Sequence, residues 1–574
     1  MEALIREDES APSGIPQRWG DINWRRVDRN VRAMQIRIAK ATQEGDWRRV
    51  KALQRSLTRS FSAKASAVRR VAMNQGARTA GVDRVEWDSP EARWAAIGRL
   101  KRRGYRPLPL RRVYIPKANG KERPLGIPTM HDRAMQALYL LALEPVSEGT
   151  SDPNSYGFRI NRSTADAMSQ LFVSLSKKAS AQWVLEADIK GCFDHISHDW
   201  LERNVPMDKA ILRKWLKAGV VFQGQFQATD AGTPQGGIIS PTLANVALNG
   251  LEQQLIESLR AKLGVANTKK LKVNVVRYAD DFVITGNTPE VLEHEVKPWV
   301  EQFLATRGLT LSTEKTRIVN IADGFDFLGW NFRKYSGTLL IKPSKKNAQA
   351  FYRKVKEVIG THRGKRTADL IQTLNPMLRG WAQYHSPVVA KAMFAHMEHL
   401  IFRCLWRWAK RRHRRKDTEW VRRTYFASVG NRNWVFGATM WNRAGERYWM
   451  ELYSMPSTPI RRHKKVRGGY HPFDPAQEMY GETLRQERMA ESMSYRRQWA
   501  KLFMSQRGLC AVCQSKITKE TGWDDHHIEP RISGGSDALG NRVLVHPDCH
   551  VQIHFHGQVA VKPVYDSSIY FVEA

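Results

Sequence analysis

Apolar residues recur at helical spacing from Trp24 to about Ala72, beginning with Val27, Val31 and Met34. This spacing predicts helices with one apolar face. Basic side chains occupy the other faces, and they are Arg25, Arg26, Arg29, Arg32, Arg37 and Lys40. A solvated basic face and contact with RNA remain equally open interpretations. Residues 1–20 contain several Pro and Gly residues and are expected to form a flexible leader.

Two β-branched runs, Lys272–Arg277 and Phe282–Thr285, flank Tyr278-Ala279-Asp280-Asp281. They predict a hairpin with adjacent carboxylates at its tip. Adjacent carboxylates repel each other unless a cation lies between them, and two-metal phosphoryl transfer uses carboxylates that bridge ions. An isolated Asp-Asp pair is more often a solvated turn, so a metal site needs a further acid. Asp188 supplies it at the end of a strand predicted over Val184–Ile189.

A second hairpin is predicted upstream, because Asn119-Gly120 lies between two strand-like runs in 110–128. It carries Lys117, Lys121 and Arg123 and can hold a triphosphate, although an ordinary basic hairpin is the alternative.

The loop Ala231–Pro241 contains Gly236 and Gly237, which let the backbone approach a flat partner closely. A helix predicted from about Pro241 turns its N-terminus toward anionic groups.

Residues 347–453 are predicted to be helical. Arg403, Arg407, Arg411 and Arg414 recur three or four residues apart, which places them on one helical face, with Trp406 and Trp408 on other faces. Seven basic residues in 410–416, without one acid, favour phosphate contact over a solvated face. The Pro- and Gly-rich segment 454–476 predicts a boundary, either a basic tether that touches DNA or a plain linker.

Composition narrows the function. The 574 residues hold 92 Lys plus Arg against 56 Asp plus Glu, a formal net charge of +36. A folded chain with this charge needs a polyanionic partner, and nucleic acid is the leading candidate. No apolar run approaches the roughly 18 residues of a membrane-spanning helix. The acidic start, 1–9, does not have the pattern of a signal peptide.

The cysteines are too few and too uneven for a disulfide framework. Cys510, Cys513, His546 and Cys549 have the identity and spacing of a tetrahedral structural Zn²⁺ site. A redox pair of Cys510 and Cys513 is the alternative. Thiols in such a role indicate a reducing compartment, so we expect a cytoplasmic protein of the bacterial cytosol or nucleoid, with an organelle as the alternative. Cys192 and Cys404 stand alone and are expected to be buried thiols.

Between these cysteines lie Asp525-His526-His527-Ile528-Glu529-Pro530, Asn541 and His550-x-x-x-His554. The set resembles the HNH nucleases, which have a ββα-metal fold. The resemblance implies that His527 is the general base, that His526, His550 and His554 hold one Mg²⁺, and that Asn541 orients the loop or joins the metal shell. His526 stands where relatives can carry Asp, and His546 where many carry Cys, which leaves the metal preference open. A purely structural zinc module is the alternative.

The order of the remaining motifs resembles the reverse transcriptases of group II introns. The motifs are the 110–128 hairpin, Asp188, Pro234-Gln235-Gly236, the Tyr278–Asp281 hairpin, and Leu374–His385, which is similar to domain X, the thumb and maturase domain. The chain is therefore identified as a member of the group II intron-encoded proteins. The implied fold is α+β and multidomain, a right hand with an antiparallel palm sheet and a helical thumb, plus a small ββα-metal domain.

The resemblance also implies roles for single residues of the polymerase. Asp188, Asp280 and Asp281 would be catalytic and hold two Mg²⁺ ions. Four residues would bind the dNTP, with Lys117 and Arg123 on its phosphates, Gln235 lining its pocket and Phe193 blocking a ribose 2′-hydroxyl. Lys315 would protonate the leaving pyrophosphate, although a surface lysine is nearly as good an interpretation. Phe325–Trp330 would form the primer grip.

Six segments are expected: a leader (1–20), an N-terminal extension with fingers (21–180), the palm (181–345), the thumb with domain X (346–453), a basic linker or DNA-binding segment (454–500) and the nuclease (501–574). The implied protein is an RNA-directed DNA polymerase, a maturase and a DNA endonuclease. Its partners would be target DNA and the intron RNA, and the residues that contact the RNA would be Arg403, Arg407, Arg411 and Arg414. No membrane association is expected, and the protein could form a homodimer. The alternatives are an RNA-binding splicing factor with idle catalytic sites and a reverse transcriptase domesticated for host defence or repair.

Overall fold

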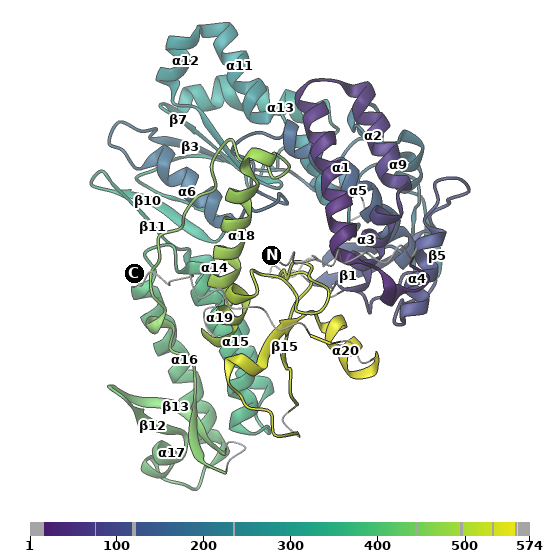
Figure 1. The fold of residues 1–574 in the computed structure, drawn as a ribbon. Coiled ribbons are helices and arrows are strands. Elements are labelled where there is room, and N and C mark those ends of the chain that lie inside the picture. The colour runs from purple at the N-terminus through teal and green to yellow at the C-terminus, as the bar shows by residue number, and fades with distance from the viewer. Residues whose placement is uncertain are drawn as a thin grey trace, which may run out of the picture.

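A computed structural model describes residues 16–74, 76–116, 122–233, 236–441, 445–493, 497–530, 533–556 and 559–560. The predicted N-terminal helices form as α1 (Trp24–Gln43), α2 (Trp47–Arg59) and α3 (Phe61–Ala72). All three pack against the nearly all-buried α5 (Met130–Thr150), at the right of Figure 1. Trp19, inside the predicted leader, is 5% exposed, so the packed chain begins before residue 20.

The fingers are built on a four-stranded sheet of order β2-β1-β4-β5. The predicted hairpin is confirmed as β1 (Leu110–Pro116) paired antiparallel with β2 (Glu122–Ile127). β4 (Val220–Phe222) and β5 (Gln225–Gln227) extend the sheet. The tip of the hairpin, with Lys117 and Lys121, lies outside the described residues.

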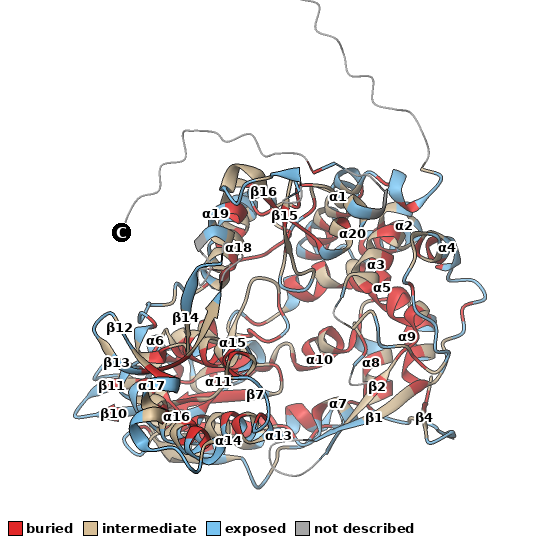
Figure 2. Cartoon of the chain, turned by 90° about the horizontal axis from the view of Figure 1, so that it is seen from below, coloured by how far each residue is buried: buried red, intermediate tan, exposed pale blue. Residues whose placement is uncertain are grey.

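The palm is a four-stranded antiparallel sheet of order β6-β7-β3-β8. Its strands are β3 (Trp183–Asp188), β6 (Asn274–Tyr278), β7 (Asp281–Gly286) and β8 (Arg317–Asn320). Side chains alternate between its faces. Leu185 and Ile284 join the core that contains α5, whereas Val184 and Val283 join the core of the thumb. Most of β7 is buried (red in Figure 2), and its side chains contribute to both cores.

The thumb comprises α14 (Lys345–Thr361), α15 (Thr367–His385), α16 (Lys391–Arg412) and α17 (Thr418–Tyr425). The prediction of helix up to residue 453 is wrong beyond α17. β12 (Phe426–Val429), β13 (Arg432–Trp441) and β14 (Arg447–Glu451) form an antiparallel sheet instead. Aromatic and β-branched residues favour strands, and Gly430, at φ +56°, supports the turn between β12 and β13.

The segment that follows the thumb is packed on the palm. Its helix α18 (Glu478–Met493) and the preceding loop converge on Asp166, in the first turn of α6 (Thr164–Leu175), whose N-cap is Ser163. Asp166 Oδ1 accepts hydrogen bonds from His463 Nε2 at 3.0 Å, Val466 N at 2.8 Å and Arg488 Nη2 at 2.7 Å. The predicted irregular linker is therefore anchored at three points.

The C-terminal unit is the predicted ββα fold, with β15 (Asp524–His527) paired antiparallel to β16 (Arg542–Val545) and followed by α20 (Pro547–His556). Together with α19 (Arg497–Ser505) it has its own apolar core. It lies against the N-terminal helices (Figure 1), where Arg93 pairs with Asp548 at 2.6 Å and Arg69 Nη1 donates to Ser515 Oγ at 2.8 Å.

The remaining helices and strands connect these units. They are α4 (Pro90–Arg99), α7 (Cys192–His195), α8 (His198–Asn204), α9 (Lys209–Leu216), α10 (Ser240–Leu248), α11 (Leu251–Leu263), α12 (Val265–Leu271), α13 (Lys297–Ala305), β9 (Phe325–Phe327), β10 (Trp330–Tyr335) and β11 (Thr338–Pro343). Among the helices of the described chain, none has the length and apolarity needed to cross a bilayer.

Candidate active sites

The register of the palm sheet brings the predicted acids together. Asp188, the last residue of β3, pairs with Asp281, the first residue of β7. Ala279, at φ +58°, makes the tight turn that carries Asp280. Burial, the Asp280 charge and a hydrogen bond with Asp188 raise the pKa of Asp281 to about 7. Burial also raises the pKa of Asp280, against the charges of Arg123 and Lys315. A group of acids in this state is suited to holding cations.

Lys315 reaches this group from the segment before β8. Its Nζ donates to Asp188 Oδ2 at 2.8 Å, and this hydrogen bond raises the pKa of Lys315. Its side chain is 65% exposed. The lysine therefore lies at the acids while remaining accessible to a substrate.

A buried arginine supports the turn at Ala279, and sequence reasoning missed it. Arg277 is 1% exposed, and its Nη1 donates to Asn245 Oδ1 at 3.2 Å and to Ala279 O at 3.1 Å. Asn245 Nδ2 in turn donates to Gly157 O at 2.8 Å. The signal in the sequence is an arginine inside an apolar strand, because a buried charge has to be hydrogen-bonded.

One of the predicted nucleotide-binding residues lines a pocket of about 300 Å³. Phe193, on α7, lines it together with Gly232, Thr233, Arg112 and Tyr114. Arg123, on β2, is exposed, and its charge acts on Asp280 as described. Gln235 lies outside the described residues, as does Lys117.

The predicted primer grip is a hairpin of β9 and β10 turned at Leu328 and Gly329. Aromatic residues of Leu374–His385 hold it. Tyr384 Oη donates to Leu328 O at 2.7 Å, and its ring stacks on Trp330 with ring centroids 4.7 Å apart.

The arginine stripe is only partly as predicted. Arg403, Arg407 and Arg411 are exposed on one face of α16, with Trp408 buried on another. Arg414 is not on this face, because α16 ends at Arg412. The backbone turns away at His413, whose Nε2 hydrogen-bonds to Tyr425 Oη at 2.7 Å. A helix end in a dense basic run also limits repulsion between like charges.

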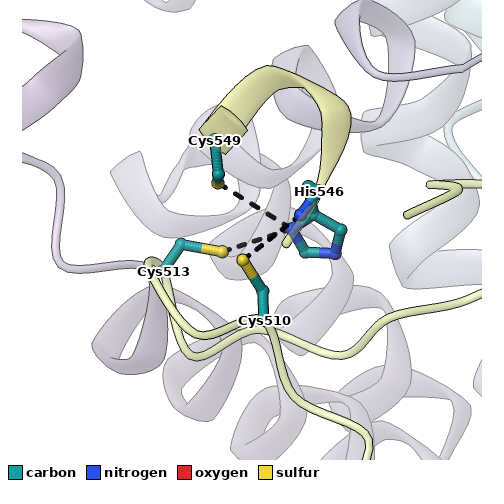
Figure 3. Close-up of side chains that lie close together, drawn as sticks. All are labelled: Cys510, Cys513, His546 and Cys549. Atoms are coloured by element: carbon teal, nitrogen blue, oxygen red, sulfur yellow. Dashed lines mark hydrogen bonds between the residues drawn. The ribbon is translucent and has the colours of Figure 1, made fainter. Parts of the chain in front are cut away.

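The four predicted zinc ligands form one cluster, with ligand atoms all within 4.8 Å of one another. Figure 3 shows the three sulfurs pointing toward His546, whose Nδ1 lies 3.3 Å from Cys513 Sγ and 3.9 Å from Cys549 Sγ. Hydrogen bonds with Cys510 and Cys513 raise the pKa of Cys549. Three thiols and an imidazole at this spacing fit a tetrahedral metal ion, which favours the metal over the redox interpretation.

A second cluster lies between β15 and α20. His526, His550 and His554 also bring their ligand atoms within 4.8 Å of one another. Burial and the two neighbouring imidazoles lower the pKa of His526 to about 4, which keeps it in the neutral form that binds metals. Asp524 Oδ2 lies 3.1 Å from His550 Nδ1, which leaves Nε2 of that ring for a ligand.

His527 and Asn541 flank this cluster. His527 Nε2 lies 2.8 Å from Asp537 Oδ1, a partner that sequence reasoning missed. Asn541 Oδ1 accepts from Glu529 N at 2.8 Å, and its Nδ2 donates to Glu529 O and Ser536 O. These bonds fit the loop-orienting alternative for Asn541 rather than a place in the metal shell.

Four protein families match the chain in succession. They are the N-terminal domain of reverse transcriptase (residues 19–100), reverse transcriptase (RNA-dependent DNA polymerase) (115–332), the group II intron maturase-specific domain (348–426) and HNH endonuclease (510–556).

Similar proteins come from bacteria and a yeast. Protein YkfC of Escherichia coli K12 is 36% identical over 302 residues, 46% of this chain and 78% of YkfC. Group II intron-encoded protein LtrA of Lactococcus lactis subsp. cremoris is 31% identical over 328 residues, 46% of this chain and 54% of LtrA. An uncharacterized 91 kDa protein in the cob intron of Schizosaccharomyces pombe is 27% identical over 54% of this chain and 47% of that protein. The match thus spans about half the length of the last two relatives.

Proposed function

This chain belongs to the group II intron-encoded proteins, with reverse transcriptase, maturase-specific and HNH endonuclease domains in one polypeptide, and from this premise we propose that it splices and mobilises its own intron. It would bind the intron RNA and assist splicing, nick one strand of target DNA, and extend the nicked 3′ end with the RNA as template. The observation that carries the proposal is the presence of two separate sites. One is Asp188 in register with Asp281, and the other is the His526–His550–His554 cluster.

In the palm, Asp188, Asp280 and Asp281 would hold two Mg²⁺ ions, which supply charge stabilisation to phosphoryl transfer when bound. Arg123 would bind the phosphates of the dNTP and Phe193 would exclude a ribose 2′-hydroxyl. Lys315, beside Asp188, would give a proton to the leaving pyrophosphate. We expect Asp280→Ala to abolish cDNA synthesis and leave splicing assistance intact. Polymerisation retained in that variant would overturn the metal assignment.

In the nuclease, Cys510, Cys513, His546 and Cys549 would hold a structural Zn²⁺, and the three clustered histidines would hold one Mg²⁺, which supplies polarisation of the scissile phosphate. His527 would take the proton of the attacking water, with Asp537 holding the ring by its Nε2. We expect His527→Ala to stop DNA nicking and leave polymerisation unchanged. Nicking that survives this substitution would remove the general-base assignment.

The RNA partner would be the intron that contains the reading frame. The exposed Arg403, Arg407 and Arg411 on α16 would contact its phosphates, so binding should weaken steeply with salt. To test this RNA partner, the protein is expressed in the cytoplasm of its host and crosslinked to RNA, and the RNA recovered with it is sequenced. One dominant RNA with sharp splice-like boundaries supports the proposal. A broad population of unrelated RNAs rejects the maturase role and leaves the polymerase standing. The same proposal includes target DNA as a second partner, which a nicking assay on a DNA substrate tests. It also includes a homodimer, which mass photometry tests.

A further inference from the structure

The segment Gly157–Arg159 is held from both ends. Gly157 O accepts the hydrogen bond from Asn245 Nδ2 at 2.8 Å. A Cβ atom at Gly157 would lie 2.2 Å from Ala279 N, so the segment rests directly on the catalytic turn. Arg159 is buried and pairs with Glu148 at 2.7 Å. The backbone of Phe158, between these two residues, is therefore fixed relative to the acids of the palm.

Phe158 combines two features that folding alone does not favour. Its φ is +58°, in the left-handed region that bulky side chains rarely adopt. Its side chain is nevertheless 52% exposed, so burial gives little in return for the strain. Strain of this kind is retained where the surrounding structure imposes it, and it concentrates at functional sites.

The Phe158 ring meets the Phe193 ring edge to face. The centroids are 6.2 Å apart and the planes are inclined by 82°. Phe193 needs such support, because it lies on the four-residue helix α7 and is only half-buried. Phe193 also lines the pocket of about 300 Å³, with Gly232 and Thr233. Phe193 therefore contacts a fixed aromatic residue and also lines this pocket.

We propose that Phe158 is a positioning residue for sugar selection, which holds the Phe193 ring in place so that a 2′-hydroxyl is rejected. The inference rests on the proposed role of Phe193. An apolar side chain rejects an added hydroxyl by roughly 100-fold at most, so a Phe193 ring that can move aside would lose much of this selectivity. An edge-to-face aromatic pair corresponds to a factor of about 2 to 10 in an equilibrium constant. Removing the Phe158 ring should cost discrimination by about this factor.

The test is single-nucleotide extension of a DNA primer on an RNA template, with kcat/KM measured for a dNTP and the matching NTP. Phe193→Ala should abolish most of the discrimination. Phe158→Ala should lower it by about 2- to 10-fold, mainly through a lower KM for the NTP, with kcat for the dNTP retained. Phe158→Tyr, which keeps the ring, should behave as wild type. The double variant should discriminate no worse than Phe193→Ala, because Phe158 acts through Phe193.

Controls separate this effect from misfolding. Phe172→Ala removes another exposed phenylalanine, on α6, and should leave discrimination unchanged. Phe158→Gly removes the ring while favouring the left-handed backbone, so it should lose the same discrimination without a lower Tm.

Three results distinguish the possible failures. If Phe193→Ala discriminates as wild type, the proposed role of Phe193 fails, and this inference with it. If Phe193→Ala loses discrimination while both Phe158→Ala and Phe158→Gly retain it, only the present inference fails. Losses that add in the double variant would also overturn it, because they would mean that Phe158 acts independently of Phe193.

Discussion

Tyr384 Oη donates a hydrogen bond to the carbonyl oxygen of Leu328 at 2.7 Å, which ties the thumb helix α15 to the turn of the predicted primer-grip hairpin. Leu328 has φ +50°, so its turn is a strained one. Stacking of Tyr384 on Trp330 fixes the ring that makes the bond. The residues that resemble the domain X hallmark therefore have a structural role at the palm, in addition to any contact with RNA.

We expect Tyr384→Phe to weaken binding of the primer–template by about fivefold. The stacking ring remains, and one hydrogen bond to a backbone carbonyl contributes about 1 kcal/mol. The Kd for a labelled primer–template and the length of product per binding event would both report it. Tyr448→Phe, at an exposed tyrosine of β14, is the matched control. Unchanged processivity in Tyr384→Phe would mean that the hydrogen bond does not hold the primer grip.

Asp166 should stabilise the chain at neutral pH and lose this contribution in acid. Burial raises its pKa, but hydrogen bonds from His463 and Arg488 outweigh that effect and hold the pKa well below its usual range. A carboxyl with a lowered pKa stabilises the folded state above its unfolded pKa of 3.8, and this is lost as pH falls through the folded pKa. We expect Asp166→Asn to lower the free energy of unfolding by about 2–3 kcal/mol at pH 7.

The measurement for Asp166 is chemical unfolding of both proteins from pH 7 down to pH 3. The difference between wild type and Asp166→Asn should shrink below about pH 4, because the wild-type carboxyl becomes protonated more easily once unfolded. A difference that stays constant over this range would show that the charge of Asp166 is not what stabilises the contact.

The nuclease should depend on the N-terminal helices through Arg93. This arginine is 7% exposed, pairs with Asp548 at 2.6 Å and is itself held by the carbonyl oxygen of Trp87 at 3.1 Å. Asp548 lies between His546 and His550, so the pair fixes the start of α20. We expect Arg93→Ala to reduce DNA nicking by about tenfold, as for other partners that support metal ligands, with polymerisation unchanged.

Two further variants complete the Arg93 experiment. The charge exchange Arg93→Asp with Asp548→Arg should restore part of the nicking, and Arg99→Ala, at an exposed arginine of α4, should have no effect. Metal analysis should find zinc bound in all of them. Nicking at the wild-type rate in Arg93→Ala would show that the nuclease works independently of this contact.

Local patterns predicted the sites better than they predicted how the sites are held. The β-branched runs predicted the Tyr278–Asp281 hairpin and the strand that ends at Asp188. The resemblance to reverse transcriptases joined the two in one site, and ligand spacing grouped Cys510 with Cys513. The contacts of Asp166 with Arg488 and of Arg93 with Asp548 join residues 322 and 455 positions apart. Such pairs leave no periodic signal in a single sequence, because any Arg can pair with any Asp that folding brings close. The sheet β12–β14 was missed because helical residues precede it without a break.

Metal binding at the palm should strengthen as pH rises through about 7. The raised pKa of Asp281 means that the folded, metal-free protein holds a proton there between its ordinary pKa of 3.8 and about 7. In this window the folded state binds more protons than the unfolded state, so this group makes the metal-free protein less stable as pH rises. A cation has to displace that proton, so its stabilising effect should grow over the same range.

The experiment measures the Tm increase caused by Mg²⁺ at pH 6, 7 and 8, in a His554→Ala background that weakens the nuclease site. We expect the smallest increase at pH 6 and the largest at pH 8. Asp281→Asn removes the titrating group, so its smaller increase should no longer vary with pH. Glu301→Gln, at an exposed residue of α13, should behave as the background protein. An Mg²⁺ effect in the background protein that is the same at all three pH values would show that Asp281 does not hold the competing proton.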